Sequence, residues 1–483
     1  MTVHYILYAI AAFIGALLIF MIIRTLCIHK PKYTYSVVKD EIDVNLVAET
    51  LSNAIRIPTV TKYKESDDQS SFIVFHDFLK NTFTEIFKRA EVTVINNYSL
   101  IIRVDGTDQS LTPGCFLAHM DVVPANKDDW EYDPFGGEVH DGYIYGRGSL
   151  DMKNQLVTSM YGLEFLLREG KVPKRTIYYC FGHDEENTGV TGALKIVEYL
   201  QKKNVRFDFV LDEGGVIMNG NIVKADGTFA LIGTCEKGYV DFQLTSEREG
   251  GHASSPKRKS SVDALADAIH DLRRTPMKMT WSQPLKEFFR TVCPYMTPVY
   301  KFLFANRDIL SPVLKLALSL SAPIMNSVLR TTFAFTQIKG SDAPNVIPVK
   351  STAIVNTRIN IGETQQQVKD HIQNVVGKDI KVDYYSRGFD PTPISKTIGS
   401  EIYSTLESSI RDVFEFIPAP YPFIAATDAK HYYPLSDNVY RFTPFNITLK
   451  EQPRIHGLNE RCKIESLEKA TLFYKVFITR TCL

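Results

Sequence analysis

The chain has 483 residues, of which 44% are hydrophobic and 23% are charged, and its 55 basic residues balance 55 acidic ones. These values are typical of a folded protein with about two domains, and the zero net charge without a basic stripe argues against a nucleic-acid-binding protein. Seven scattered cysteines are too few for a disulfide scaffold. Cys115 and Cys180 fall in apolar runs, where buried free thiols are expected.

An uncharged apolar run from Tyr5 to Ile23 opens the chain. It is long enough to cross a bilayer as a helix, so we expect a membrane anchor within residues 1–30. A cleaved signal peptide is the alternative, although no basic segment precedes the run and no small-residue cleavage site closes it.

Two signals disagree about the side of the membrane on which the rest of the chain lies. The basic residues after the run favour the cytosol, but large domains translocate regardless of flanking charge; these residues are Arg24, Lys30 and Lys32. The triplets that begin at Asn97 and Asn446 would accept glycans in a lumen. We expect a single-pass protein whose folded part is luminal or extracellular, and secretion after cleavage is the alternative.

Apolar periodicity predicts alternating helices and strands after a polar linker at 30–41. The helices are expected at 45–55, 72–87, 152–168 and 192–202, and the strands at 92–95, 100–104, 116–124, 143–145, 176–181 and 207–211. Strands that alternate with helices predict an α/β fold with a mostly parallel sheet. In the helix at 152–168, the residues at helical spacing indicate core packing; they are Leu156, Met160, Leu163 and Leu167.

Polar side chains stand at the carboxyl ends of three of these strands. They are His119, Asp121, Glu185, Glu186 and Asp212. Residues two apart on a strand project from the same face, which places His119 beside Asp121. A neutral imidazole binds Zn²⁺ while a neighbouring carboxylate fixes its other nitrogen, so we expect one metal site along this edge of the sheet.

The pattern changes near Gly233, where we expect a second domain inserted into the first. An alternating strand at 240–245, a helix at 261–272 and strands at 331–338 and 352–359 predict an α+β domain over 236–386. The first domain would then comprise 31–235 and 387–483, with a helix at 397–416, a Pro-rich crossing at 418–422 and a last helix.

Within the inserted domain, residues 281–329 are unusually apolar. We expect them to form a helical subdomain with its own core. Two functional alternatives are a groove for a long acyl chain and a patch that rests on a membrane.

Eight residues in this order resemble the dizinc exopeptidase and aminoacylase family: His119, Asp121, Asp151, Glu185, Glu186, Asp212, His252 and His456. The matching segments are 117–124, 146–154, 183–192, 211–215, 250–254, 345–348 and 455–460, and they cover nearly all of the chain after about Val44. Three of its motifs are most similar to those of the N-fatty-acyl-amino-acid synthase/hydrolases and of carboxypeptidase S. They are Gly-His-Asp-Glu-Glu, Asp-Glu-Gly-Gly and Arg-Ile-His-Gly-Leu-Asn-Glu. The resemblance implies an α/β catalytic domain with an inserted lid of the dimerisation type.

The resemblance also implies two zinc ions and the residues that bind them. His119 and Asp212 would bind one ion, Glu186 and His456 the other, and Asp151 would bridge both. Three carboxylates and two imidazoles leave each metal an open position, as catalysis requires.

Other roles follow from the same resemblance. Asp121 would orient His119, Glu185 would be the general base and His252 would stabilise the oxyanion. Asn345 and Arg358 would grip a substrate carboxylate.

Two further family features bear on particular positions. The family often has a cis peptide bond after the bridging aspartate, here Asp151–Met152. Many members have glycines before the Thr-Asp pair, whereas Ala425 and Ala426 stand there in this chain, and we assign that loop no role.

The implied function is a zinc amidohydrolase that cleaves the amide bond of N-fatty-acyl amino acids, with the reverse condensation left open. A peptide carboxypeptidase of the carboxypeptidase S type is the alternative, and a membrane-tethered binding protein without catalysis is a third hypothesis. Serine hydrolysis is not supported, because Ser149 lacks a Gly-x-Ser-x-Gly frame. A homodimer is also open, since in some relatives the histidine that matches His252 reaches a neighbouring subunit's site.

Overall fold

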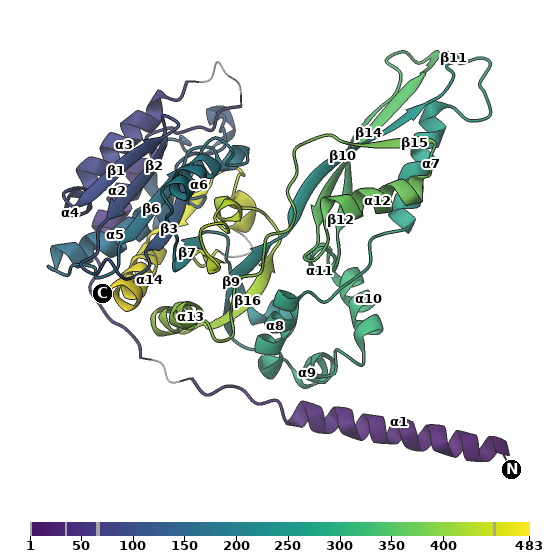
Figure 1. Cartoon of the computed structure of the whole chain (residues 1–483), viewed down its shortest axis with the longest axis horizontal. Helices are drawn as coiled ribbons and strands as arrows, with labels where there is room; N and C mark the ends of the chain where they lie inside the picture. The colour runs from purple at the N-terminus through teal and green to yellow at the C-terminus, as the bar shows by residue number, and fades with distance from the viewer. Residues whose placement is uncertain (1, 34–35, 64–67, 448–450) are drawn as a thin grey trace. The chain divides into compact units, whose positions relative to one another are not determined.

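The computed structural model describes residues 2–33, 36–63, 68–447 and 451–483, and the chain forms two compact units. Unit 1 comprises Met1–Lys30, Cys235–Pro393 and Pro422–Ala426, and unit 2 comprises Pro31–Thr234, Ile394–Tyr421 and Thr427–Leu483. Unit 1 therefore includes the expected insertion at 236–386 together with the amino-terminal apolar run. Unit 2 combines early and late parts of the chain, coloured purple to teal and yellow in Figure 1.

A nine-stranded sheet forms the centre of unit 2, in the order β1-β2-β6-β3-β7-β17-β9-β16 with β8 beside β9. The four central strands β6, β3, β7 and β17 are parallel, whereas β1, β2 and β9 join as antiparallel neighbours. The expected parallel sheet is therefore found at the centre, where the site residues lie. The strands are β1 (Ala90–Ile95), β2 (Ser99–Val104), β3 (Gly114–His119), β6 (Ile177–Gly182), β7 (Phe209–Asp212), β8 (Ile217–Asn219), β9 (Thr228–Glu236), β16 (Ile417–Phe423) and β17 (Val439–Arg441).

Helices and a small second sheet complete unit 2. The helices are α2 (Val44–Ile55), α3 (Ser70–Thr82), α4 (Thr84–Phe87), α5 (Lys153–Arg168), α6 (Ala193–Lys202), α13 (Glu401–Phe414) and α14 (Ile464–Cys482). The small sheet has the order β18-β5-β4, with strands β4 (Glu138–His140), β5 (Tyr143–Tyr145) and β18 (Arg461–Lys463).

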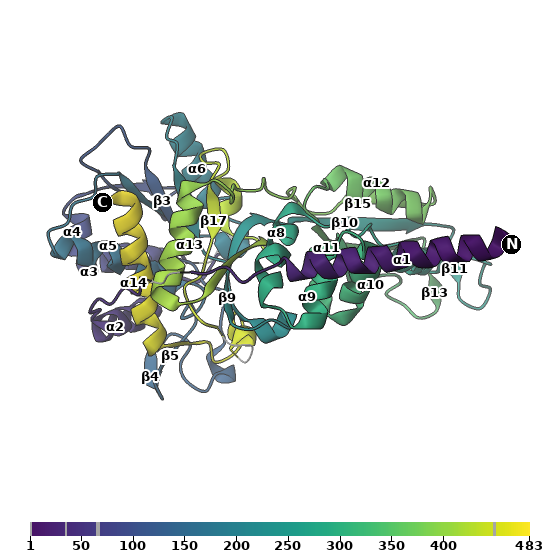
Figure 2. The ribbon, with the colours of Figure 1, turned by 90° about the horizontal axis from the view of Figure 1, so that it is seen from below.

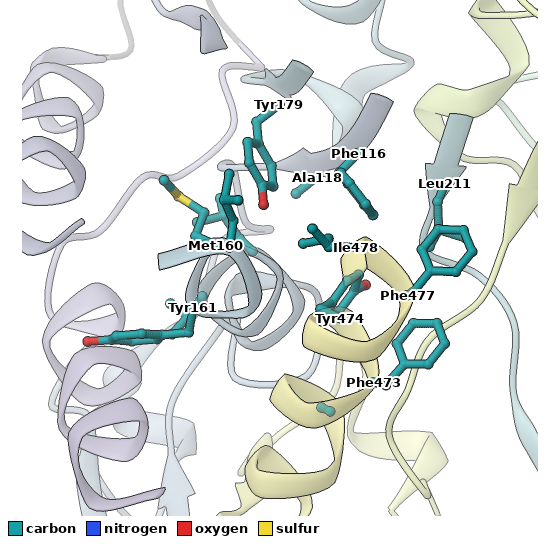
Figure 3. Close-up of a cluster of buried hydrophobic side chains, with 14 of the residues drawn as sticks. Phe116, Ala118, Met160, Tyr161, Tyr179, Leu211, Phe473, Tyr474, Phe477 and Ile478 are labelled. Atoms are coloured by element: carbon teal, nitrogen blue, oxygen red, sulfur yellow. The ribbon is translucent and has the colours of Figure 1, made fainter. Parts of the chain in front are cut away.

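Helix α5 is the centre of the core beneath the sheet. Its predicted apolar stripe of Leu156, Met160, Leu163 and Leu167 is buried, and α5 packs on α14. Figure 3 shows aromatic side chains of α14 meeting residues of β3, β6 and β7; the Tyr474 ring, for example, meets Phe116 edge-on with 6.0 Å between ring centroids. Burial of each such side chain stabilises the fold by about 1.5–3 kcal/mol. This packing fixes the strands whose carboxyl ends hold the site.

Two expected elements differ from those observed. The expected helix at 72–87 is interrupted at Phe83, and the next turn begins as α4, where the buried Glu164 carboxylate accepts hydrogen bonds from the backbone amides of Glu85 and Ile86. The expected Pro-rich crossing at 418–422 is a strand, β16. It lies at the end of the sheet order, where a proline need not donate to a ladder.

Unit 1 contains an antiparallel sheet in the order β12-β14-β10-β15, with α7 and α12 packed together on one face (Figure 1). Beyond the Glu247–Lys350 end of the β10–β14 ladder, the chain forms a two-stranded ribbon of β11 and β13. The elements are α7 (Ser261–Arg274), α12 (Gln365–Val376), β10 (Gly238–Glu247), β11 (Gly251–His252), β12 (Thr332–Lys339), β13 (Val346–Ile347), β14 (Lys350–Ile359) and β15 (Ile380–Tyr384).

The apolar stretch at 281–329 folds into four short helices of unit 1 (Figure 2). They are α8 (Gln283–Val292), α9 (Pro298–Ala305), α10 (Ser311–Ser321) and α11 (Pro323–Leu329). They have a core of their own, as expected: Phe289 stacks on Phe304 with 4.3 Å between ring centroids, and Leu314 and Leu329 are buried.

The amino-terminal run forms one helix, α1 (Thr2–Leu26). From Val3 to Leu26 it is long and apolar enough to cross a bilayer, and its described side chains are almost all exposed.

Candidate metal centre

Three adjacent parallel strands bring the site residues together at their carboxyl ends. β3 ends at His119, β6 leads into Glu185 and Glu186, and β7 ends at Asp212, directly before Glu213. β3 lies between β6 and β7 in the sheet, so these ends are neighbours. The expected convergence along this edge is present within unit 2.

Asp151 lies between two imidazoles. Its Oδ1 is 3.1 Å from Nε2 of His119, and its Oδ2 is 2.9 Å from Nε2 of His456. Glu186 Oε2 lies 3.0 Å from the same His456 nitrogen. A carboxylate that presents one oxygen to each imidazole has the geometry of a bridging ligand, as the resemblance implied for Asp151.

The carboxylate beside His119 is that of Glu213, whereas the expected ligand was Asp212. Glu213 Oε1 lies 3.4 Å from His119 Nε2. The Asp212 carboxylate instead accepts hydrogen bonds from the backbone amides of Glu213 and Ala429, at 2.9 and 2.8 Å. The geometry therefore adds Glu213 as a candidate ligand beside Asp212, which stays a prediction; the Asp212 carboxylate also holds the backbone that carries Glu213.

No metal is part of the structure, and the donor set itself shows whether one fits. The N···O separations of 2.9–3.4 Å match the roughly 3.3 Å between ligand atoms that tetrahedral zinc bonds of ~2.0–2.1 Å require. The donors form two overlapping groups that share Asp151: His119 with Glu213, and His456 with Glu186. These residues could therefore hold a metal ion.

The electrostatics favour positive charge at the same place. Burial, and then the nearby charge of Asp151, raise the pKa of Glu213 to about 8, and burial also raises the pKa of Glu186. Hydrogen bonds to Asp151 and Glu186 raise the pKa of His456 to about 10. A cation bound among these carboxylates would stabilise their ionised forms.

Asp121 connects the metal-binding imidazole with the loop that follows β6. Its carbonyl oxygen lies 2.9 Å from His119 Nδ1, and its carboxylate oxygen lies 3.4 Å from the same nitrogen. The two carboxylate oxygens also accept hydrogen bonds from the backbone amides of Glu185 and Glu186, at 3.2 and 3.1 Å. Asp121 thus positions one ligand histidine, one ligand glutamate and the expected base together.

Glu185 lies within the cluster without bridging the imidazoles. Its carboxylate groups with His119 and Glu213, with all ligand atoms within 4.8 Å of one another. Burial raises the pKa of Glu185 well above that of an ordinary glutamate. A carboxyl with a raised pKa next to a metal-binding cluster has the proton affinity that a general acid–base catalyst requires.

Arg147 and Glu460 support the centre, and the sequence interpretation did not assign them a role. The Arg147 guanidinium donates to Glu460 at 2.6 Å and to the carbonyls of His456 and Gly457 at 3.2 and 3.1 Å. Glu460 accepts in turn from the backbone amide of Asp151. Both residues lie inside the matching segments 146–154 and 455–460, and this position could have marked them as candidates. The sequence alone does not show that Arg147 and Glu460 form an ion pair.

Two glycines give the turn before Asp151 a backbone geometry that residues with a side chain rarely adopt. Gly146 and Gly148 adopt φ of +152° and +85°, and a Cβ on Gly146 would lie 2.4 Å from the Ile55 side chain. The Asp151–Met152 peptide bond is cis, as the resemblance implied.

The remaining expected site residues belong to unit 1. His252 is exposed on β11, where its Nδ1 accepts a hydrogen bond from Ser254 Oγ at 2.7 Å, and it pairs with Val346. Asn345 is next to that pair, since its carbonyl accepts from the Ala253 amide at 3.0 Å. Unit 1 thus brings His252 and Asn345 together at the ribbon.

Arg358 lies elsewhere on unit 1. It stands near the opposite end of β14, with its guanidinium 4.9 Å from the Tyr239 ring centroid. The ribbon lies beyond Lys350, so Arg358 is separated from it by more than roughly 26 Å of extended strand, at about 3.3 Å per residue. Unit 1 does not bring Arg358 together with His252.

Comparisons with known proteins identify the family of the chain. A profile of peptidase family M20/M25/M40 matches residues 115–480. An N-fatty-acyl-amino acid synthase/hydrolase PM20D1 of Xenopus tropicalis is 40% identical over 89% of this chain and 84% of its own length. Probable carboxypeptidase S-like 2 of Dictyostelium discoideum is 34% identical over 91% and 85%.

Solved structures share the fold at lower identity. An M20 family metallo-carboxypeptidase, Sso-CP2 of Sulfolobus solfataricus, superposes with a TM-score of 0.62 at 17% identity, covering 91% of this chain and 99% of its own. Human carnosine dipeptidase 1 superposes with a TM-score of 0.61 at 16% identity, covering 91% and 96%.

Proposed function

The chain belongs to peptidase family M20/M25/M40, a family of metal-dependent hydrolases of amide and peptide bonds, and we propose that it hydrolyses N-fatty-acyl amino acids with two zinc ions. The observation that carries the proposal is the Asp151 carboxylate, which faces His119 with one oxygen and His456 with the other. The first ion would be held by His119, Asp151 and Glu213, and the second by His456, Asp151 and Glu186. Bound divalent cations at such a site supply Lewis-acid polarisation of the amide carbonyl.

The chain's own residues supply the proton transfers and the orientation. Glu185 takes a proton from the attacking water and delivers it to the leaving amine nitrogen, which its raised pKa favours. Asp121 holds Glu185 near His119, because its carboxylate accepts hydrogen bonds from the backbone amides of Glu185 and Glu186. Arg358, with a planar guanidinium, suits the free carboxylate of the amino acid product.

We propose an acyl amino acid as the substrate, in preference to a peptide, because of the names and identities of the relatives. The Xenopus protein at 40% identity and mammalian proteins at 33–35% are named N-fatty-acyl-amino acid synthase/hydrolases. Proteins named carboxypeptidase S-like are 31–34% identical, and yeast carboxypeptidase S is 28% identical. Peptide carboxypeptidase activity is therefore the second candidate.

A comparison of two substrates tests the proposal. We expect kcat/KM for oleoyl-phenylalanine to exceed that for an amino-blocked dipeptide of similar polarity. Glu185→Gln should lower kcat by about 10²–10⁴-fold while the metal content is retained. A clear preference for the dipeptide would establish the carboxypeptidase, and a fully active Glu185→Gln would remove Glu185 from the chemistry.

We also propose that the enzyme acts as a homodimer in which unit 1 of one copy completes the other copy's site. Arg358 and His252 lie too far apart on one unit 1 to bind the carboxylate and the adjacent amide oxygen of the same substrate. With Arg358 acting in its own copy, His252 would have to come from the partner to stabilise the oxyanion, and Asn345, which lies beside His252, would come with it.

Co-expression of two inactive variants tests whether His252 acts in its own copy or in the partner's site. Glu185→Gln and His252→Ala should each have low activity alone, and co-expression should restore activity, because a mixed dimer contains one site with both residues intact. Activity that stays at the level of the separate variants would contradict the exchange. The control substitution is Ile338→Ser, at an exposed residue of unit 1. It should leave the activity at the parent level.

The location is proposed from the sequence and α1. We propose that α1 anchors the protein with its catalytic part in a lumen or outside the cell. Asn97 is exposed and accessible to a glycan, whereas the triplet that begins at Asn446 ends at Thr448, outside the described residues. A mobility shift on glycosidase treatment, lost in Asn97→Gln, would support this side, and an unmodified Asn97 in membranes of the native cell would oppose it.

A further inference from the structure

Helix α10 has apolar side chains on two faces, and only one of these faces is buried in the fold. Leu314 is buried in the core of the short helices, whereas Val313, Leu316 and Leu320 are exposed by 69%, 54% and 78%. Positions 313, 316 and 320 lie along one side of a helix. The neighbouring helices add Val299 of α9 and Ile324 of α11, also at least half exposed. We call these five side chains, Val299, Val313, Leu316, Leu320 and Ile324, the α9–α11 apolar set.

The carboxyl end of α1 is attached to these helices. Asn306 Nδ2 donates to the Met21 carbonyl and to Thr25 Oγ1, both at 3.2 Å, and Lys301 Nζ donates to the Ile28 carbonyl at 2.7 Å. Arg24 pairs with Asp308 at 2.7 Å. Figures 1 and 2 both show this end of α1 beside α9.

This attachment fixes the depth of the short helices if α1 spans a bilayer. The last turns of α1, with Arg24 and the following Lys30, then lie at the level of the lipid headgroups. α9 must lie at the same level because it binds those turns directly. Exposed valine, leucine and isoleucine side chains at that depth can insert into the boundary between headgroups and acyl chains.

The charges near the set agree with an anionic or zwitterionic lipid surface. Residues 298–330 contain four basic side chains and a single acidic one, Asp308, which is paired with Arg24. The basic side chains are Lys301, Arg307, Lys315 and Arg330. Exposed apolar side chains with basic neighbours are the composition of helices that lie in a membrane interface.

The degree of exposure argues against a groove for the acyl chain. Side chains that line a groove are partly covered by its opposite wall, whereas Leu320 is 78% exposed and Val313 is 69% exposed. We therefore propose that the α9–α11 apolar set rests on the bilayer that α1 spans, as a second point of membrane contact. The inference rests on the proposed anchoring by α1, and it is independent of which substrate is cleaved.

Fluorescence quenching in the full-length protein tests the contact. Cys27 is the exposed cysteine among the described residues, so a Cys27→Ser background allows single labelling. Leu320→Cys would carry an environment-sensitive fluorophore, with Ile338→Cys, 66% exposed on β12 of the same unit, as the matched control. The labelled proteins would be placed one per nanodisc, in phosphatidylcholine with or without brominated acyl chains.

We expect brominated lipid to quench the label at 320 by about twofold or more and to leave the label at 338 nearly unchanged. Equal quenching at both sites, or none at 320, would overturn the proposal. A blue-shifted label at 320 without quenching would also overturn it, because it would show packing against protein.

A second measurement separates this surface from the chemistry. The triple variant Val313→Ser, Leu316→Ser, Leu320→Ser should lose several-fold in kcat/KM for oleoyl-phenylalanine presented in vesicles and keep the parent value for soluble acetyl-phenylalanine. Unchanged rates on both substrates would contradict the contact, and so would an equal loss on both. If the parent cleaves neither substrate, the proposed function fails while the quenching result still decides the contact.

Discussion

Asp121 is the residue on which most of the site's geometry depends. It is fully buried, and it contacts His119 while its carboxylate accepts hydrogen bonds from the amides of Glu185 and Glu186. The resemblance gave it only the first task. The second follows from the β6 loop folding back over β3, which no local sequence pattern indicates.

Asp121→Asn tests this double role. An asparagine side chain has one acceptor oxygen, and its NH₂ group would face a backbone N–H, so Glu185 and Glu186 should shift together. We expect activity and zinc affinity to fall by about 10–100-fold. Asp128→Asn, on an exposed turn, is the control and should match the parent. Parent-level zinc affinity in Asp121→Asn, measured by competition with a chelator, would show that the carboxylate does not position the ligands.

The position of Glu213 beside His119, directly after the predicted ligand Asp212, shows the limit of sequence reasoning at this scale. Consecutive residues of a strand point to opposite faces, so the ligand depends on where β7 ends and how the chain turns. The strand ends at Asp212, and Asp212 accepts from Ala429, more than two hundred positions away. A local sequence pattern does not predict a contact between residues so far apart in the chain.

At the scale of elements, hydrophobic periodicity located most of the helices and strands. α5 and its apolar stripe were predicted because 3.6-residue spacing reports burial directly. The break at Phe83 was not, since it depends on the distant Glu164, which accepts hydrogen bonds from the amides of α4. β16 was missed because its prolines are tolerated only by its place in the sheet.

Helix α13 contains an acid whose charge opposes folding. Burial raises the pKa of Glu407 to about 7, and Arg411, 4.0 Å away, offsets only part of this cost. In the unfolded chain this proton is released near the ordinary glutamate pKa of 4.5. Between these two pH values the folded state binds more protons than the unfolded state, so this group makes stability fall as pH rises.

Glu407→Gln should therefore stabilise the protein at high pH and leave it unchanged at low pH. We expect a gain of about 1–3 kcal/mol in the free energy of unfolding near pH 8 and almost none near pH 4. Thermal unfolding at both pH values measures it, with the exposed Glu49→Gln on α2 as control. An equal effect at both pH values would show that the charge of Glu407 is not the cause.

At the scale of the whole molecule, the sequence indicated an inserted α+β domain and one sheet edge with a metal site. It did not show that His252 and Arg358 would lie at opposite ends of the β10–β14 ladder and its ribbon. Register between distant strands decides that separation, and register is set by packing that a single sequence does not display.

The account depends on two cations shared by residues from five separate segments of the chain. The metal content of the purified full-length protein, measured by mass spectrometry together with activity before and after chelation, tests this directly. We predict about two zinc equivalents per chain in the parent, about one in Glu213→Gln, and activity that is lost on chelation and restored by zinc. Full activity in a parent protein stripped of metal would contradict the account.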